Sequence, residues 1–138
     1  MTKRRVYIVD DTEEVRTSLV FLLQAEGYAC RVFPDGSEFL TELLGLDPGC
    51  VLLDYQMPGL TGLDVLSELR WMEVEWPVVM MTGHGNVNVA TKAMSRGAFD
   101  FLEKPFEEEV LMQILDKAFS SGKWARKPQP PAARPSAV

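Results

Sequence analysis

The stretch VLLDYQMPGLTG, residues 51–62, contains the features that decide the fold. An apolar run leads to a single carboxylate, Asp54, and the chain then enters a turn marked by Pro58, Gly59 and Gly62. A short apolar run that ends at turn residues is typical of a buried strand. We therefore expect a strand that leaves the core at Asp54 and presents this acid at its tip.

The same pattern repeats on both sides of this stretch, because short apolar runs alternate with segments of helical periodicity. The expected strands are residues 5–10, 28–33, 50–54 and 77–82, with a fifth, shorter strand within residues 98–104. The expected helices are residues 11–27, 35–45, 62–72, 86–97 and 106–119. Strict alternation predicts a parallel sheet with helices on both faces, which is the doubly wound α/β class.

Two of the expected helices have features that fix their start or their orientation. Asp35 and Glu38 stand at capping-box spacing at the start of the second helix. The spacing of apolar residues in helix 86–97 predicts that four of them face the core: Val87, Ala90, Ala93 and Met94.

The composition fits one globular domain followed by an extension of different character. The 138 residues are 46% hydrophobic and 25% charged, as in ordinary globular proteins. No run approaches the ~18–20 apolar residues of a membrane span. The apolar segment near the N-terminus is too short to be the core of a signal peptide. We expect one domain over residues 1–120, a Pro-rich flexible tail or linker over residues 121–138, and a cytoplasmic location.

Charge and cysteine content narrow the function classes further. Residues 1–119 carry 10 basic and 20 acidic residues, which disfavours direct binding to nucleic acid. Residues 120–138 carry four basic residues and no acid, a charge too low and too spread to indicate such binding. Cys30 and Cys50 do not have metal-ligand spacing, so we expect buried free thiols.

Reactive side chains follow the carboxyl ends of the expected strands. Asp10 and Asp11 follow the first strand, Asp54 ends the third, Thr82 ends the fourth and Lys104 follows the fifth. Because ligands of such sheets bind at this edge, we expect these groups to converge. Clustered carboxylates raise each other's pKa, and a hard divalent cation relieves the repulsion. The three acids therefore predict a Mg²⁺ site.

The same set of groups indicates phosphoryl chemistry. A carboxylate at a strand tip beside a cation can attack phosphorus and become an acyl phosphate. Thr82 can donate a hydrogen bond to a phosphoryl oxygen, and the Lys104 ammonium can neutralise another. Phosphoryl transfer requires mainly positioning and charge neutralisation, and these residues supply both.

Four motifs in this order resemble the receiver domain of bacterial two-component response regulators, the CheY-like superfamily. They are VDD (9–11), LLDYQMPGLTG (52–62), MMTGHG (80–85) and FDFLEKPF (99–106). The resemblance covers residues 4–119, and the last two motifs are most similar to FixJ-type and NtrC-type receivers, which control transcription. It implies a flavodoxin-like (βα)5 fold whose five-stranded sheet has the order 2-1-3-4-5.

The resemblance also implies a role for each acidic residue. Asp54 would accept a phosphoryl group from a sensor histidine kinase. The metal, Mg²⁺ or Mn²⁺ in its place, would be held by Asp10, Asp11, Asp54 and the backbone carbonyl of Gln56. One position departs from the commonest pattern of the family, because Thr12 stands where many members have an acid. This change bears on metal affinity and dephosphorylation rate.

The remaining site residues would bind the phosphoryl group and respond to it. The resemblance implies that Thr82 and Gly83 belong to the phosphate-binding switch and that Lys104 pairs with the phosphate. Phe101 would be the switch aromatic that moves inward, and the Lys104–Pro105 peptide would be cis. From the residues alone, Phe101 has the alternative of a plain core aromatic.

The partners implied by the resemblance are those of a signalling switch. Phosphorylation would favour a homodimer with a second receiver through helix 86–97, strand 98–104 and helix 106–119. A C-terminal DNA-binding output domain, not in this chain, would read the change. The chain would catalyse its own phosphotransfer and autodephosphorylation and would not be a metabolic enzyme; no membrane contact is expected.

Two other function classes fit the motifs less well. A Mg²⁺-dependent phosphatase of the haloacid-dehalogenase kind requires two acids separated by one residue after the first strand, whereas Asp10 and Asp11 are adjacent. A nucleotide or flavin binder would use GHGNVN (83–88), but Asn88 replaces the third glycine of the fingerprint.

Single residues also have alternatives without phosphoryl chemistry. Asp11 has the spacing to cap helix 11–27 with Glu14. His84, the one histidine of the sequence, has either a loop role or an influence on the lifetime of the acyl phosphate.

Overall fold

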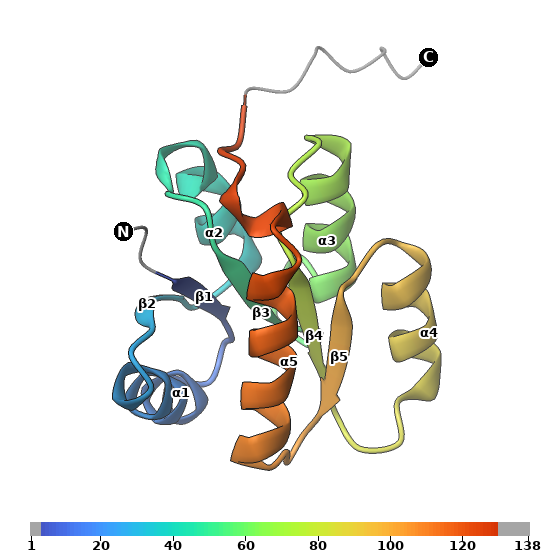
Figure 1. The fold of residues 1–138 in the computed structure, drawn as a ribbon. Helices are drawn as coiled ribbons and strands as arrows, with labels where there is room; N and C mark the ends of the chain where they lie inside the picture. The colour runs from blue at the N-terminus through green and yellow to red at the C-terminus, as the bar shows by residue number, and fades with distance from the viewer. Residues whose placement is uncertain (1–3, 130–138) are drawn as a thin grey trace.

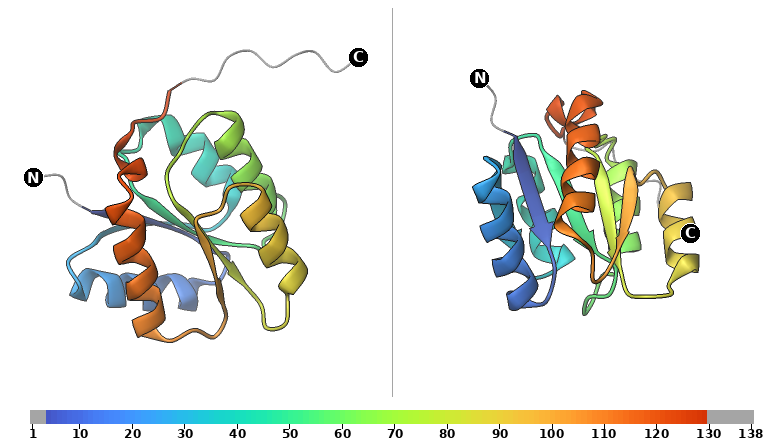
Figure 2. Two further views of the ribbon diagram at one scale, coloured as in Figure 1. Left: turned by 45° about the vertical axis from the view of Figure 1, so that its right-hand side comes forward. Right: turned by 60° about the horizontal axis from the view of Figure 1, so that its bottom comes forward.

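The computed structural model describes residues 4–129, in which five parallel strands form one sheet with helices on both faces (Figure 1 and Figure 2). The strand order is β2-β1-β3-β4-β5, so the expected doubly wound fold and its order are confirmed. The strands are β1 (Arg5–Val9), β2 (Ala29–Phe33), β3 (Cys50–Asp54), β4 (Val78–Thr82) and β5 (Asp100–Glu103).

The helices form two layers, with α1 and α5 on one face of the sheet and α2, α3 and α4 on the other. Their bounds are α1 (Glu13–Ala25), α2 (Gly36–Glu42), α3 (Gly62–Trp71), α4 (Val87–Ser95) and α5 (Glu108–Ser120). Two short 3-10 helices complete the described chain, η1 (Leu43–Gly45) and η2 (Lys123–Ala125). Residues 43–45 therefore tighten into a 3-10 turn where the sequence predicted the last turn of an α-helix.

The central strands explain why their sequences are unbroken apolar runs. β3 and β4 are buried along their whole length, and successive side chains point to opposite faces of the sheet. Val51 and Leu53 accordingly join the core under α2 and α3, whereas Leu52 joins the core under α1 and α5. Because β3 is the middle strand, Asp54 emerges at the centre of the sheet edge.

The turn after β3 is held in place by a glycine and a cap. A Cβ atom on Gly62 would lie 2.6 Å from the backbone oxygen of Asp54, so α3 can start against this strand only with glycine there. The Gly62 amide donates to the carbonyl of Tyr55 at 2.8 Å. Thr61 and Asp64 form a capping box that sequence reasoning missed. These contacts fix the backbone directly beside Asp54.

Two predicted caps have different outcomes. The side chain of Asp35 accepts a hydrogen bond from the Glu38 amide at 2.8 Å, so the predicted cap of α2 is present. Helix α1, in contrast, has Thr12 as its N-cap residue and no side-chain cap bond. The alternative in which Asp11 serves as the cap of α1 is therefore wrong, and the Asp11 carboxylate lies exposed.

Of the four α4 residues predicted to face the core, two are buried and two are exposed. Ala90 and Ala93 are buried as expected, together with Val89, but Val87 is 71% exposed and Met94 is 44% exposed. The side of α4 that is buried in the core is narrow, because this helix covers the outer part of the sheet, near the edge strand β5. Val87 and Met94 lie beside the buried side of the helix and line an open pocket next to β5.

The start of the predicted tail lies against the domain. The Trp76 indole, fully buried in the core, donates to the backbone carbonyl of Arg126 at 2.6 Å. Trp124 packs edge-on against Phe119, with ring centroids 5.1 Å apart. The domain boundary at residue 120 stays a prediction, and the rest of the predicted tail, residues 130–138, lies outside the described residues.

Cys30 and Cys50 are free thiols, as expected, but only Cys50 is fully buried, whereas Cys30 is partly buried. Burial raises the pKa values of Cys30 and Cys50 to about 11 and about 12. These thiols are therefore protonated at neutral pH. None of the helices within residues 4–129 has both the length and the apolar character needed to cross a membrane.

Candidate functional site

The structure brings the predicted acidic residues together at the carboxyl edge of the sheet, toward which β4 and β5 run in Figure 1. Asp10 and Asp11 follow β1, and Asp54 ends β3. Carboxylate oxygens of the three residues lie within 4.8 Å of one another. Asp10 and Asp54 are buried, with 0% and 6% of their surface exposed, whereas Asp11 faces solvent. The cluster is therefore open to an ion or ligand from the side of Asp11.

Lys104 supplies the positive charge of this cluster. Its Nζ lies 2.7 Å from Asp10 Oδ2 and 3.4 Å from Asp54 Oδ1. Burial alone lowers the pKa of this ammonium, but the Asp10 hydrogen bond and the charges of both acids together raise the pKa above its usual value. Lys104 is therefore fully charged at neutral pH. It leads into a cis peptide bond with Pro105, the geometry expected at this position.

Asp10 is held by hydrogen bonds from three directions. Its Oδ1 accepts from the Thr12 amide at 2.9 Å, and its Oδ2 accepts from Lys104. The Arg16 guanidinium donates to the Asp10 backbone oxygen at 2.7 Å. This set orients the carboxylate and the turn after β1, which is how groups around a metal ligand fix its direction.

Asp54 has a strongly perturbed pKa. Burial and the neighbouring charge of Asp10 raise the pKa from an ordinary value of 3.8 to about 6, with a smaller contribution from Asp11 that also raises it. Lys104 lowers the pKa but does not outweigh these effects. A carboxylate that is destabilised by burial and by like charges gains from any added cation.

The donor set fits a hard divalent cation. Three carboxylates converge, the ligands are all oxygens, and the described residues 4–129 place no histidine or thiolate among them. Few carboxylates and an open side, which leaves room for retained water, suit Mg²⁺, and Mn²⁺ accepts the same donors. Gln56 lies exposed just after Asp54, and the role of its carbonyl as a ligand stays a prediction.

Thr82 ends β4 beside the acidic cluster. The residue is 2% exposed, yet among the described residues 4–129 its hydroxyl donates only to the Leu102 carbonyl, at 3.5 Å. An O–H···O hydrogen bond normally spans about 2.5–3.0 Å, so this contact holds the hydroxyl weakly. The hydroxyl is thus free to turn toward a new acceptor. Gly83 follows at the exposed start of the next loop, and its part in phosphate binding stays a prediction.

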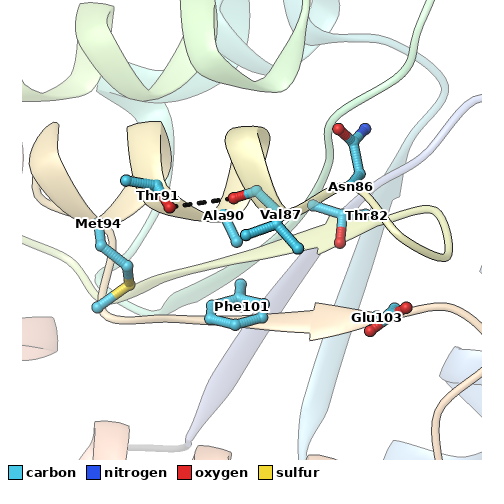
Figure 3. Close-up of a pocket in the computed structure, with 8 residues that line it drawn as sticks. All are labelled: Thr82, Asn86, Val87, Ala90, Thr91, Met94, Phe101 and Glu103. Atoms are coloured by element: carbon cyan, nitrogen blue, oxygen red, sulfur yellow. Dashed lines mark hydrogen bonds between the residues drawn. The ribbon is translucent and has the colours of Figure 1, made fainter.

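An open pocket of about 460 Å³ lies next to Thr82, between α4 and β5 (Figure 3). Its lining residues are Thr82, Asn86, Val87, Ala90, Thr91, Met94, Phe101 and Glu103. Phe101 is 40% exposed, so it is not a plain core aromatic in this state. The pocket offers space beside the Phe101 ring, and inward movement of the ring stays a prediction.

Sequence reasoning missed Glu103, which joins β5 to the loop after β4. Its Oε1 accepts from the Gly85 amide at 2.8 Å and lies 2.7 Å from His84 Nδ1. The predicted loop role of His84 therefore has a specific contact. No pattern in the sequence indicated this contact of Glu103. It arises from the pairing of β4 with β5, which places Glu103 opposite Thr82.

The raised pKa of Asp54 predicts a pH-dependent stability in metal-free buffer. The folded protein holds the Asp54 proton more tightly than the unfolded chain, so this stabilisation is complete below about pH 3.8 and is lost as pH rises through about 6. The free energy of unfolding should fall by on the order of 2–3 kcal/mol across this window. Urea unfolding of the protein and of Asp54→Asn with EDTA measures it. If the free energy of unfolding varied with pH in the same way for both proteins, the raised pKa would not belong to Asp54.

Comparison with known proteins identifies the class. The response regulator receiver domain matches residues 6–116, and the chain belongs to this family. The site residues discussed above all lie in the matched segment.

The chain is similar to transcriptional regulators of bacteria. It is 42% identical over 126 residues to the transcriptional regulatory protein FixJ of Bradyrhizobium diazoefficiens, covering 91% of this chain and 62% of FixJ. It is 33% identical over 129 residues to the DNA-binding transcriptional regulator NtrC of Salmonella typhimurium, covering 94% of this chain and 28% of NtrC. The crystal structure of full-length FixJ from B. japonicum superposes with a TM-score of 0.83 at 42% identity, covering 88% of this chain and 60% of that one.

These comparisons bear out the predicted resemblance to FixJ-type and NtrC-type receivers and give no support to the phosphatase alternative. The chain spans less than two thirds of the length of these relatives.

Proposed function

We propose that this chain is a phosphorylation-operated switch in which Asp54 accepts the phosphoryl group. The observation that carries the proposal is the position of Asp54 at the sheet edge. There its carboxylate lies 3.4 Å from the Lys104 ammonium, and its oxygens lie within 4.8 Å of those of Asp10 and Asp11. A nucleophile, a fixed cation and a set of metal ligands thus share one small volume, which is what phosphoryl transfer requires.

The reaction follows from these positions. A carboxylate oxygen of Asp54 attacks phosphorus, an acyl phosphate bond forms, and the donor leaves with the electron pair of its bond to phosphorus. Lys104 neutralises one phosphoryl oxygen, and the weakly held hydroxyl of Thr82 turns to donate to another. Mg²⁺ held by Asp10, Asp11, Asp54 and the Gln56 carbonyl would supply further neutralisation of phosphoryl charge. Water then hydrolyses the acyl phosphate and resets the switch, so the chain catalyses only its own phosphorylation and dephosphorylation.

The partners of the switch follow from the family. A sensor histidine kinase in the cytoplasm would donate the phosphoryl group, and a C-terminal DNA-binding domain would read the state of the receiver. The names of the relatives support this proposal, since FixJ and NtrC are transcriptional regulators that extend well beyond the length matched here.

A second receiver is the partner we propose for the face formed by α4, β5 and α5. Four large apolar side chains on this face are more than a third exposed: Val87, Met94, Phe101 and Val110. Exposed apolar groups gathered on one face favour association, and inward movement of Phe101 would alter that face on phosphorylation.

The test is the intact mass of the protein after incubation with acetyl phosphate, with Mg²⁺ and with EDTA. We expect one added phosphoryl group with Mg²⁺ and a loss of most of the adduct with EDTA, because the charge of the cluster is then unrelieved. Sedimentation of the phosphorylated sample tests for the second receiver. A metal-independent adduct, or an adduct on a peptide that lacks Asp54, would contradict the proposal.

A further inference from the structure

Helix α4 is anchored firmly at its C-terminal end. The guanidinium of Arg70, at the end of α3, donates to the carbonyls of Val74 at 2.5 Å, Trp76 at 3.1 Å and Gly97 at 2.7 Å. Gly97 lies in the turn between α4 and β5. Hydrogen bonds from a charged donor to three carbonyls are strong and directional, so they tie this turn to the framework of α3 and β4.

The N-terminal end of α4 is anchored far more weakly. Its N-cap residue, Asn86, makes no side-chain cap bond. Within the described residues 4–129, both side-chain contacts of loop 83–86 go to one residue, Glu103 on β5. They are the hydrogen bond from the Gly85 amide, at 2.8 Å, and the contact with His84, at 2.7 Å.

The position of Glu103 couples this loop to the switch hydroxyl. Glu103 pairs with Thr82 in the register of β4 and β5, and loop 83–86 begins at the next residue after Thr82. If the backbone of Thr82 shifts as its hydroxyl turns toward a phosphoryl group on Asp54, loop 83–86 moves with it, because the two are covalently continuous. The pocket beneath α4, which Thr82 and Glu103 both line, leaves space for this movement (Figure 3).

We propose that Glu103 is a latch that holds loop 83–86 in the resting state and opposes the movement of Thr82. Phosphorylation of Asp54 has to release the Gly85 and His84 contacts, while Arg70 keeps the other end of α4 in place. The latch thereby sets the free-energy difference between the two states of the receiver. This inference rests on the proposed function of Asp54.

The first test measures the affinity for beryllofluoride, a phosphoryl mimic, in the presence of Mg²⁺. Glu103→Ala should bind beryllofluoride about threefold to tenfold more tightly than the native protein, because the exposed Gly85 hydrogen bond and the His84 contact stabilise the resting state alone. Glu103→Gln retains an acceptor for the Gly85 amide and should lie between the two. Glu26→Ala, an exposed acid at the end of α1, is the matched control and should not change the affinity. Unchanged or weaker binding by Glu103→Ala overturns the latch.

The second test follows hydrogen exchange of the Gly85 amide in the resting protein. Exchange should be faster in Glu103→Ala and unchanged in Glu26→Ala, because the Gly85 amide donates to Glu103. Equal exchange in both variants overturns the latch independently of phosphorylation. If the native protein fails to bind beryllofluoride while Gly85 exchange responds as expected, the failure lies with the proposed function of Asp54, and the latch loses its role in switching.

Discussion

Replacing Asp54 with asparagine should abolish the phosphoryl adduct. Acetyl phosphate labelling should fall by about two orders of magnitude or more, because an amide lacks the nucleophilic carboxylate oxygen. Asp10 is a poor substitute, since it is fully buried and bonded to Lys104 and to the Thr12 amide. Intact mass after incubation with acetyl phosphate and Mg²⁺ measures the loss.

The matched control for this experiment is Asp116→Asn, which removes an exposed carboxylate from α5. It should be labelled like the native protein. An adduct that persists in Asp54→Asn and disappears in a variant of another acid would contradict the assignment of the phosphorylation site.

The same Asp54→Asn variant should be more stable than the native protein in metal-free buffer at about pH 7.5. The raised pKa of Asp54 means that its ionised form is unfavourable in the fold, chiefly through burial and the charge of Asp10. The asparagine side chain has the same shape without that charge. A gain of stability together with a loss of labelling excludes unfolding as the reason for the loss.

The strands and the acidic cluster could be predicted because two physical rules act directly on the sequence. A strand covered on both faces must be apolar along its length, so β3 and β4 stand out as unbroken runs. Parallel strands share one carboxyl edge, so acids that follow different strands converge whatever their distance along the chain. Asp10 and Asp54 meet for this reason, although 43 residues separate them.

The contacts that sequence reasoning missed depend on how elements pack against each other. Val87 and Met94 fit a helical apolar pattern, but α4 lies near the edge strand, where the buried side of the helix is narrower than the pattern. Glu103 contacts the loop after β4 because the register of β5 brings it beside Thr82. The Trp76 indole finds its acceptor at Arg126, 50 residues further on. No local rule of propensity or periodicity specifies such partners.

Replacing Lys104 with methionine should destabilise the metal-free protein. The ammonium is the cation that contacts both buried acids, at 2.7 Å from Asp10 and 3.4 Å from Asp54. Without it, the fully buried carboxylate of Asp10 loses its cationic partner, and removing one partner of a buried pair is costly. Because Lys104 is 27% exposed, we expect a decrease of about 2–3 kcal/mol in the free energy of unfolding, less than for a fully buried pair.

Mg²⁺ distinguishes this electrostatic loss from a loss of packing. A divalent ion on Asp10, Asp11 and Asp54 would compensate the same charges, so Mg²⁺ should restore part of the stability of Lys104→Met. Lys117→Met removes an exposed lysine from α5 and is the matched control, with neither the decrease nor the rescue. Urea unfolding of both variants, with EDTA and with Mg²⁺, gives the four values.

The phosphoryl mimic separates the two roles of Lys104. Even with Mg²⁺ bound, Lys104→Met should bind beryllofluoride about 10- to 100-fold more weakly, because a charge-assisted hydrogen bond to the mimic is lost. Rescue of stability without rescue of this affinity would assign Lys104 both tasks, as counterion of the acids at rest and partner of the phosphoryl group after transfer. Native stability of Lys104→Met in EDTA would instead mean that solvent neutralises the acids, and the lysine would then act on the phosphoryl group alone.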